Sequence, residues 1–224
     1  MLAQRLGLSI NSTRPLGKWS PDDEDSLEAW YQNQVGITLD GSDVKTWADS
    51  STNGYDMVQN TASEQPAYSG GVLTFVAADD NNLQTAGQVS LSGAFTVAIR
   101  LYPTSFSNVV IADNTTANEF IKITANNTIR IKVDGSASDF SLDSGTFGDD
   151  YIVLTRDGSN LITLWKNGVA QADTETRAGT VDIDCIGVRK TDLNAYEGTI
   201  KEIQIYSSSS SDLTTNVNTR LKTL

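Results

Sequence analysis

Short runs in which apolar and polar residues alternate are the feature that most limits what this chain can fold into. Residues 94–101, AFTVAIRL, put four large apolar side chains on one face, and residues 128–133, TIRIKV, repeat the pattern with three. A period of two is typical of a half-buried strand, because successive side chains point to opposite faces of a sheet. Turn-forming dipeptides at 134–135, 157–158 and 167–168 separate such runs. The sequence therefore predicts an all-β, antiparallel structure.

The C-terminal end departs from this alternation in two places. Ile203 and Ile205 share one face of the last predicted strand but Ile200 does not, which predicts a β-bulge between them. After a serine run at 207–211, apolar residues recur at every fourth position behind Asp212, a candidate N-cap. These apolar residues are Leu213, Val217 and Leu221. Their spacing predicts one short amphipathic helix.

The composition excludes several kinds of chemistry. The chain has no histidine and one cysteine, Cys185, which removes histidine bases, histidine metal sites and an intrachain disulfide. A net charge of −12 disfavours nucleic acid as a partner, because such binding is dominated by cationic contacts to phosphate. No apolar run approaches the roughly 18 residues of a membrane span, and the first ten residues lack the apolar stretch of a secretory signal. We expect a soluble protein without membrane association or export signal, with Cys185 in its core.

Several segments, taken in their order along the chain, resemble a known family. LEAWYQNQVGITLDGSDVKTWADSSTNGYDMVQ at 27–59, LTRDGSNLITLWKNGVAQ at 154–171 and YEGTIKEIQIY at 196–206 are similar to the strands and hairpins of laminin-G-like, concanavalin A-like jelly-roll domains. The resemblance covers roughly residues 27–224. It implies a two-sheet antiparallel β sandwich (jelly roll) with a short C-terminal helix. We therefore divide the chain into an extended N-terminal arm at 1–25 and a jelly-roll domain at 26–224.

The fold that this resemblance implies carries lectins, glycosidases, adhesion modules and structural domains, so the family alone says little about activity. Glucanases of this fold place their catalytic carboxylates on alternate residues of one strand, because a retaining pair must face one groove. The nearest match here is Asp182 and Asp184, which lack a third carboxylate at Ile186 and are expected to face solvent. The strand at 201–206 offers only Glu202. We expect no catalytic residues, and a hydrolase using an unrecognised carboxylate pair is the less favoured reading.

The segment DSSTNGYDMVQN at 49–60 looks at first like a calcium loop, with oxygen side chains at alternate positions and glycine at the sixth. Its twelfth position holds Asn60 where such a loop needs a bidentate glutamate, and its flanks read as strands. In the resembling family this stretch is a polar turn after a core tryptophan. We expect Asp49 to bond local amides, Asn53-Gly54 to supply positive φ, and Trp47 to be buried.

A second candidate for calcium is the run DDNN that begins at Asp79 and Asp80. Laminin-G-like modules can hold calcium at a sandwich edge through such side chains, so the resemblance makes a metal site there conceivable. Aspartate and asparagine are also favoured in turns because their side chains bond nearby backbone amides. We expect a polar turn and no cofactor, with calcium at Asp79 and Asp80 as the weaker alternative.

Sugar binding would need exposed aromatic side chains along a groove. The candidates are Trp30, Trp47, Trp165, Tyr55, Tyr102 and Tyr196. The three tryptophans each lie next to apolar strand residues and match core positions in the resembling family, so we expect them to be buried. Tyr102, which stands beside Pro103 in a turn, is the least certain of the set.

The first 25 residues differ from the rest of the chain. They show no sustained period and contain Pro15 and Gly17, which predicts an extended arm. Its first 20 residues hold three cations and no acid, a charge of +3 ahead of the acidic run at 22–25. The cations and apolar anchors of this arm, which are the predicted partner-binding residues, are Leu2, Arg5, Leu6, Leu8, Ile10, Arg14, Leu16, Lys18 and Trp19.

Jelly-roll domains with short N-terminal arms resemble the decoration and fibre proteins of tailed-phage virions. The main hypothesis is therefore a non-enzymatic structural protein of a virion, a capsid decoration or a tail or fibre component. It would be assembled in the cytoplasm of a bacterial host and would dock through its arm onto other virion proteins. The alternative is a carbohydrate-binding, lectin-like module that recognises a surface polysaccharide.

Overall fold

A computed structural model describes residues 18–189 and 194–224, and within them the fold is almost entirely β. The strands are β1 (Leu27–Tyr31), β2 (Ile37–Asp40), β3 (Asp43–Trp47), β4 (Met57–Val58), β5 (Ala67–Ser69), β6 (Val72–Phe75), β7 (Leu83–Leu91), β8 (Phe95–Pro103) and β9 (Asn108–Ala112). They continue with β10 (Phe120–Ala125), β11 (Thr128–Val133), β12 (Ser136–Ser141), β13 (Asp150–Arg156), β14 (Leu161–Lys166), β15 (Val169–Thr176), β16 (Val181–Ile186) and β17 (Gly198–Tyr206). The helices are α1 (Ser211–Leu221) and three 3₁₀ turns at Pro21–Asp23, Ala62–Glu64 and Ala77–Asp79.

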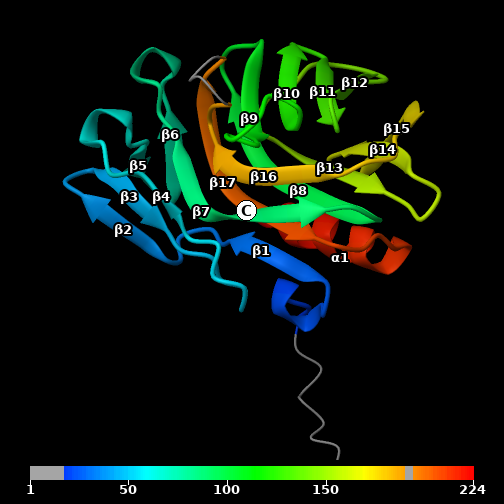
Figure 1. Ribbon diagram of the computed structural model, residues 1–224, viewed down its shortest axis with the longest axis horizontal. Helices are drawn as coiled ribbons and strands as arrows, with labels where there is room; N and C mark the ends of the chain where they lie inside the picture. The colour runs from blue at the N-terminus through cyan, green and yellow to red at the C-terminus, as the bar shows by residue number, and fades with distance from the viewer. Residues whose placement is uncertain (1–17, 190–193) are drawn as a thin grey trace, which may run out of the picture.

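All strand pairs are antiparallel, and together they form one hydrogen-bonded network that folds into two facing layers (Figure 1). One layer runs β17, β8, β13, β14, β15, with β1 and β6 on the other side of β17. The second layer runs β4, β7, β16, β9, β10, β11, β12. Strands β2, β3 and β5 join the layers along one side. The predicted all-β antiparallel sandwich with a C-terminal helix is confirmed.

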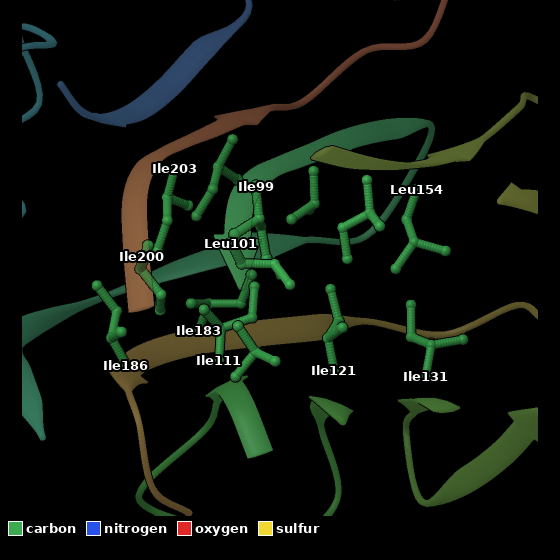
Figure 2. Close-up of a cluster of buried hydrophobic side chains, with 14 of the residues drawn as sticks. Ile99, Leu101, Ile111, Ile121, Ile131, Leu154, Ile183, Ile186, Ile200 and Ile203 are labelled. Atoms are coloured by element: carbon green, nitrogen blue, oxygen red, sulfur yellow. The ribbon is translucent and has the colours of Figure 1, made fainter. Parts of the chain in front are cut away.

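The main core fills the space between these layers. Ile99 and Leu154 come from one layer and meet Ile111, Ile121 and Ile131 from the other, all of them buried (Figure 2). Burying one such side chain fully is worth about 1.5–3 kcal/mol, so this apolar interior is the principal source of stability. Cys185 is buried beside the main core, as its apolar surroundings predicted.

The local turn chemistry follows the sequence closely. Asn167 and Gly168 have φ of 51° and 82° and join β14 to β15, and Asp134 and Gly135 repeat the arrangement between β11 and β12 at 45° and 79°. Two consecutive positive φ angles match the twist of the flanking strands, and Asn-Gly or Asp-Gly pairs adopt them readily. The predicted bulge in β17 is also present, because its pairing with β8 shifts register between Ile200 and Glu202.

Helix α1 packs against the outer side of β8 and β13, where Leu213, Val217 and Leu221 join a second, smaller apolar cluster. The predicted spacing of its buried face is thus confirmed. The predicted cap was wrong: the Ser210 side chain accepts a hydrogen bond from the Leu213 amide, and Asp212 lies inside the first turn. Serine and aspartate cap equally well, and only the path of the chain decides which residue stands at the boundary.

Glu202, the lone carboxylate predicted in the last strand, ties α1 to the sandwich. It is completely buried on β17 and forms a bidentate pair with Arg220 of the helix, at 2.5 and 2.9 Å. It also accepts hydrogen bonds from the Trp30 indole and from the Asn33 amide. The Arg220 guanidinium lies 4.8 Å from the centre of the Trp30 ring. Because its oxygens accept from donors on both elements, Glu202 fixes the position of the helix on the sandwich.

Candidate binding groove

A groove of about 500 Å³ lies between α1 and the outer surface of strands β13 and β14. Its floor on the sandwich side is formed by Thr155 and Trp165, and its other wall by the segment 209–219, which contains the helix and the serines before it. Asp157 is the one charged side chain among the described residues that line it. The groove therefore forms because the C-terminal helix packs on the sheet beside β14. Ligand sites of this size commonly combine an apolar platform with a few fixed polar groups.

Trp165 provides the apolar platform. It is half-buried: the indole packs against the small cluster under α1 and also lines the groove. Its Nε1 lies 3.4 Å from Thr155 Oγ1, which holds the ring plane in place. We expected a core position for Trp165, and this is only half right, because β14 turns the residue to the outer surface of the layer, where the helix covers it incompletely.

The helix side of the groove presents fixed hydroxyl oxygens. Thr214, Thr215 and Thr219 each donate their hydroxyl proton, at 2.8 Å, to a carbonyl oxygen four residues earlier. A hydroxyl that has given its proton to the backbone keeps acceptor capacity on its oxygen. At Thr215 and Thr219, which are exposed, this wall therefore offers acceptors in a fixed geometry.

Asp157 adds a further acceptor to the groove, and Asn218 also lines it. The Asn218 amide donates through Nδ2 to the Thr214 carbonyl at 2.8 Å, and its Oδ1 is buried with no hydrogen-bond partner among the described residues. Asp157 uses one oxygen, Oδ1, to accept from the Ser159 and Leu161 amides at 2.8 and 2.9 Å. The site as a whole is rich in acceptors, so it suits a ligand that carries several hydroxyl donors and an apolar face.

The other predicted aromatic residues do not gather at this groove. Trp30 and Trp47 are buried, at 6% and 0% exposure, as predicted, and Tyr196 is buried as well. Tyr55 is half-buried against the main core. Tyr102 is 45% exposed on β8 and lines none of the grooves described for this chain. Trp165 is thus the one member of the six that the structure places at the groove beside α1.

A second groove, of about 630 Å³, lies beside β4 and β7. Amide and carboxylate side chains make up most of its polar lining, and two of them are bonded to each other, since Gln59 donates to Glu64 at 3.0 Å. No aromatic side chain among the described residues lines it. It lacks the apolar platform that distinguishes the groove beside α1.

The segment 49–60 is a turn, and Asp49 organises it. Its carboxylate accepts from the amides of Trp30, Ser51 and Tyr55 at 2.9, 2.8 and 3.1 Å. Gly54 has a φ of 76°, while Asn53 does not share the positive φ that we expected for the pair. The role predicted for Asp49 is confirmed. Three backbone amides and the Ser51 hydroxyl donate to this carboxylate. Protein donors therefore occupy the positions around its oxygens that a metal ion would take.

Asp79 and Asp80 form a turn after β6. Both are exposed, and Asp80 adopts a left-handed conformation with φ of 51° as its amide closes the 3₁₀ turn onto Ala77. Asn81 and Asn82 are buried and bond to nearby backbone: Asn81 accepts from the Val76 amide and Asn82 donates to the Asp80 carbonyl. Across residues 18–189 and 194–224, no group of three or more Asp, Glu, His or Cys residues is placed to hold a metal ion.

Asp184 does not face solvent, contrary to our expectation. It is 7% exposed, and its Oδ1 accepts from the Asn114 amide at 2.6 Å, because the loop after β9 folds over this part of β16. Burial raises the pKa of the Asp184 carboxyl, and the neighbouring charges of Asp113 and Asp182 raise it further. Asp182 is half-buried. A strand pattern cannot show such a covering loop, which is why the sequence placed both carboxylates at the surface.

Most of the predicted docking arm lies outside the described residues, which begin at Lys18. This applies to Leu2, Arg5, Leu6, Leu8, Ile10, Arg14 and Leu16. Of the remaining two, Lys18 is exposed, while Trp19 is half-buried and packs against the apolar cluster under α1. The Trp19 indole donates to Glu24 Oε1 at 2.9 Å. No helix in the described part of the chain is long and apolar enough to cross a membrane.

Comparison with known proteins places the fold. Domain 4 of AbnA, an extracellular arabinanase from Geobacillus stearothermophilus solved with arabinotriose, is 15% identical, with a TM-score of 0.58 over 88% of this chain and 98% of that one. The binding domain of paraclostridial mosquitocidal protein 1 is 13% identical, with a TM-score of 0.57 over 91% of this chain and 53% of that one. The binding domain of botulinum neurotoxin DC, solved with rat synaptotagmin II, is 17% identical, with a TM-score of 0.51 over 91% and 52%.

Two of these similar structures are binding domains, and the third is one domain of an arabinanase. No protein-family profile and no curated protein sequence matches this chain. At identities below 20%, the likeness shows the fold alone, a β sandwich.

Proposed function

We propose that this chain is a carbohydrate-binding domain that takes a neutral oligosaccharide in the groove beside α1. The observation that carries the proposal is the half-buried Trp165 platform beside a wall of fixed oxygen acceptors. A sugar ring has an apolar C–H face that packs on an indole and a rim of hydroxyl groups that donate to such acceptors. The likeness of the fold to an arabinanase domain solved with arabinotriose supports this reading.

The charge of the groove argues for a neutral ligand. Its described lining contains one carboxylate, Asp157, and no lysine or arginine. A carboxylated or sulfated sugar would meet an acidic site on a chain whose net charge is −12. We therefore propose that neutral oligosaccharides bind and that acidic ones are disfavoured.

Binding without catalysis is part of the same proposal. The groove holds a single carboxylate, whereas glycoside hydrolysis normally needs a pair. Incubation with a panel of β-glucans and arabinans should release no reducing ends, and steady release by the purified chain would overturn this part of the proposal.

The direct test is a panel of neutral and acidic oligosaccharides, followed by calorimetric titration of the best ligand. Trp165→Ala should weaken binding by about tenfold, since an aromatic stack is worth up to about 1.5 kcal/mol. Tyr102→Ala is the matched control, because that ring is exposed and lies away from the groove. Equal affinity of the Trp165→Ala variant and the original chain would contradict the proposed site. If no oligosaccharide of the panel binds, the proposed function is wrong.

A virion role remains a second proposal, supported by the +3 charge of residues 1–20 and by the apolar anchors of the arm. A displayed carbohydrate-binding domain and a docked virion component are compatible. In this proposal the arm attaches the domain to other virion proteins, with assembly in a bacterial cytoplasm. Deleting residues 1–17 should leave a folded domain that no longer joins its assembly, and undiminished incorporation would contradict the docking role.

A further inference from the structure

A smaller groove of about 220 Å³ lies on the opposite flank of α1. It is lined by Lys18, Trp19, Asn216, Thr219 and Arg220. Trp19 is half-buried and its indole is held by the bond to Glu24 Oε1, so the ring is a second fixed platform beside the helix.

This flank is continuous with the groove that contains Trp165. Thr219 lines both grooves, and Trp19 and Trp165 pack against the same apolar cluster under α1. Between the two tryptophans, the exposed threonines 215 and 219 form the outer surface of the helix. A bound ligand can therefore extend from one groove into the other over Thr219, along the exposed surface of the helix.

The charge of the smaller groove also fits a neutral ligand. Arg220 is already paired with the buried carboxylate of Glu202 and stacked on Trp30. Its positive charge is therefore compensated from within the protein, so the residue contributes an amphipathic surface and no strong attraction for anions. Lys18 is exposed to solvent, where screening weakens its field.

We propose that Trp19 is a second sugar subsite, and that Trp165 and Trp19 mark the two ends of one site for a linear oligosaccharide that crosses α1. This inference rests on the proposed function and adds the length of the ligand. A helix with its side chains is about 10–12 Å across, so the two platforms are reached together only by a chain of several sugar units. A short ligand fills the Trp165 groove alone.

The test measures affinity against ligand length, with the full chain and a neutral oligosaccharide series from the disaccharide to the hexasaccharide. In the original chain the affinity should rise by about tenfold between ligands that fill one groove and ligands that reach both, the gain of one more aromatic stack. Trp19→Ala should remove this rise and leave the affinity for the shortest ligands unchanged. Trp165→Ala should lower the affinity for every length.

Controls separate this inference from the proposal on which it rests. Trp19→Phe keeps an aromatic ring and should retain most of the length dependence. Melting temperatures are measured for both Trp19 variants, so that a loss of packing under the helix is distinguished from the loss of a sugar contact. If Trp19→Ala keeps the full length dependence, the second subsite is wrong and the groove at Trp165 stands. If no length binds the original chain, both proposals fall.

Discussion

At the scale of single residues, buried and half-buried carboxylates hold parts of this protein together. Asp49 gathers three backbone amides and one hydroxyl into the turn at 49–60, and Glu202 fixes α1 to the sheet. Several protein donors take the place of water around each of these carboxylates. A charge removed from water stabilises a fold only when it has such partners. Some of the acidic residues thus form hydrogen bonds and ion pairs inside the protein. An acidic residue in this sequence is therefore a poor indicator of catalysis or metal binding.

Replacing Asp49 with alanine should lower the free energy of unfolding by about 2–3 kcal/mol, because three half-buried backbone amides lose a charged acceptor. Urea denaturation followed by tryptophan fluorescence measures the effect. Asp40→Ala is the control, since that aspartate is exposed on β2. A loss for Asp49→Ala no larger than for Asp40→Ala would contradict the role of Asp49.

Asp184 makes stability depend on pH in a defined direction. Its pKa is raised in the folded state, chiefly by burial, so its favourable contribution is present at low pH and is lost as the pH rises through the folded pKa. Asp184→Asn does not titrate. Its stability relative to the original chain, measured by urea denaturation, should therefore improve as the pH rises from the ordinary aspartate pKa of 3.8 through the raised pKa of the folded state.

Asp139 is a control for Asp184, because its pKa is shifted in the opposite direction. Its hydrogen-bonded pair with Arg130 lowers its pKa, so its contribution is present at high pH and is lost as the pH falls through the folded pKa. Asp139→Asn should therefore lose stability relative to the original chain as the pH rises. The same pH trend for both variants would show that the two carboxylates do not differ as described.

At the scale of elements, the alternating runs, the Asn-Gly and Asp-Gly hairpins, the bulge in β17 and the spacing of α1 could all be predicted, because each depends on neighbours in sequence. The short strands β4 and β5 and the three 3₁₀ turns carry no such period. The cap of α1 was misplaced by two residues, since Ser210 and Asp212 are equally suitable and the backbone path selects between them.

Ser210→Ala should cost about 1 kcal/mol of stability through the loss of the Leu213 cap bond. Ser209→Ala is the neighbouring control and should stay within about 0.5 kcal/mol. Thermal unfolding monitored by circular dichroism separates the two. An equal effect of both substitutions would argue against Ser210 as the cap.

At the scale of the whole molecule, the groove beside α1 is a product of tertiary packing. The sequence singled out Trp165 as an aromatic candidate but favoured the core, because nothing in its local pattern tells how far a distant helix will cover it. The groove needs β14 to present Trp165, β13 to present Thr155, and a C-terminal segment about 50 residues later to supply the opposite wall. Such a site becomes visible only when the layers and the helix are assembled.

The proposed site for a neutral oligosaccharide lies between Trp165 and α1. The most direct measurement is a titration of ¹⁵N-labelled protein with the best neutral ligand, followed by two-dimensional NMR. We predict that the shifts concentrate on the Trp165 indole N–H and on the amides of 209–219, with the segment 49–60 and the groove beside β7 unchanged. Shifts confined to those other surfaces, or no shifts at saturating ligand, would contradict the proposed site.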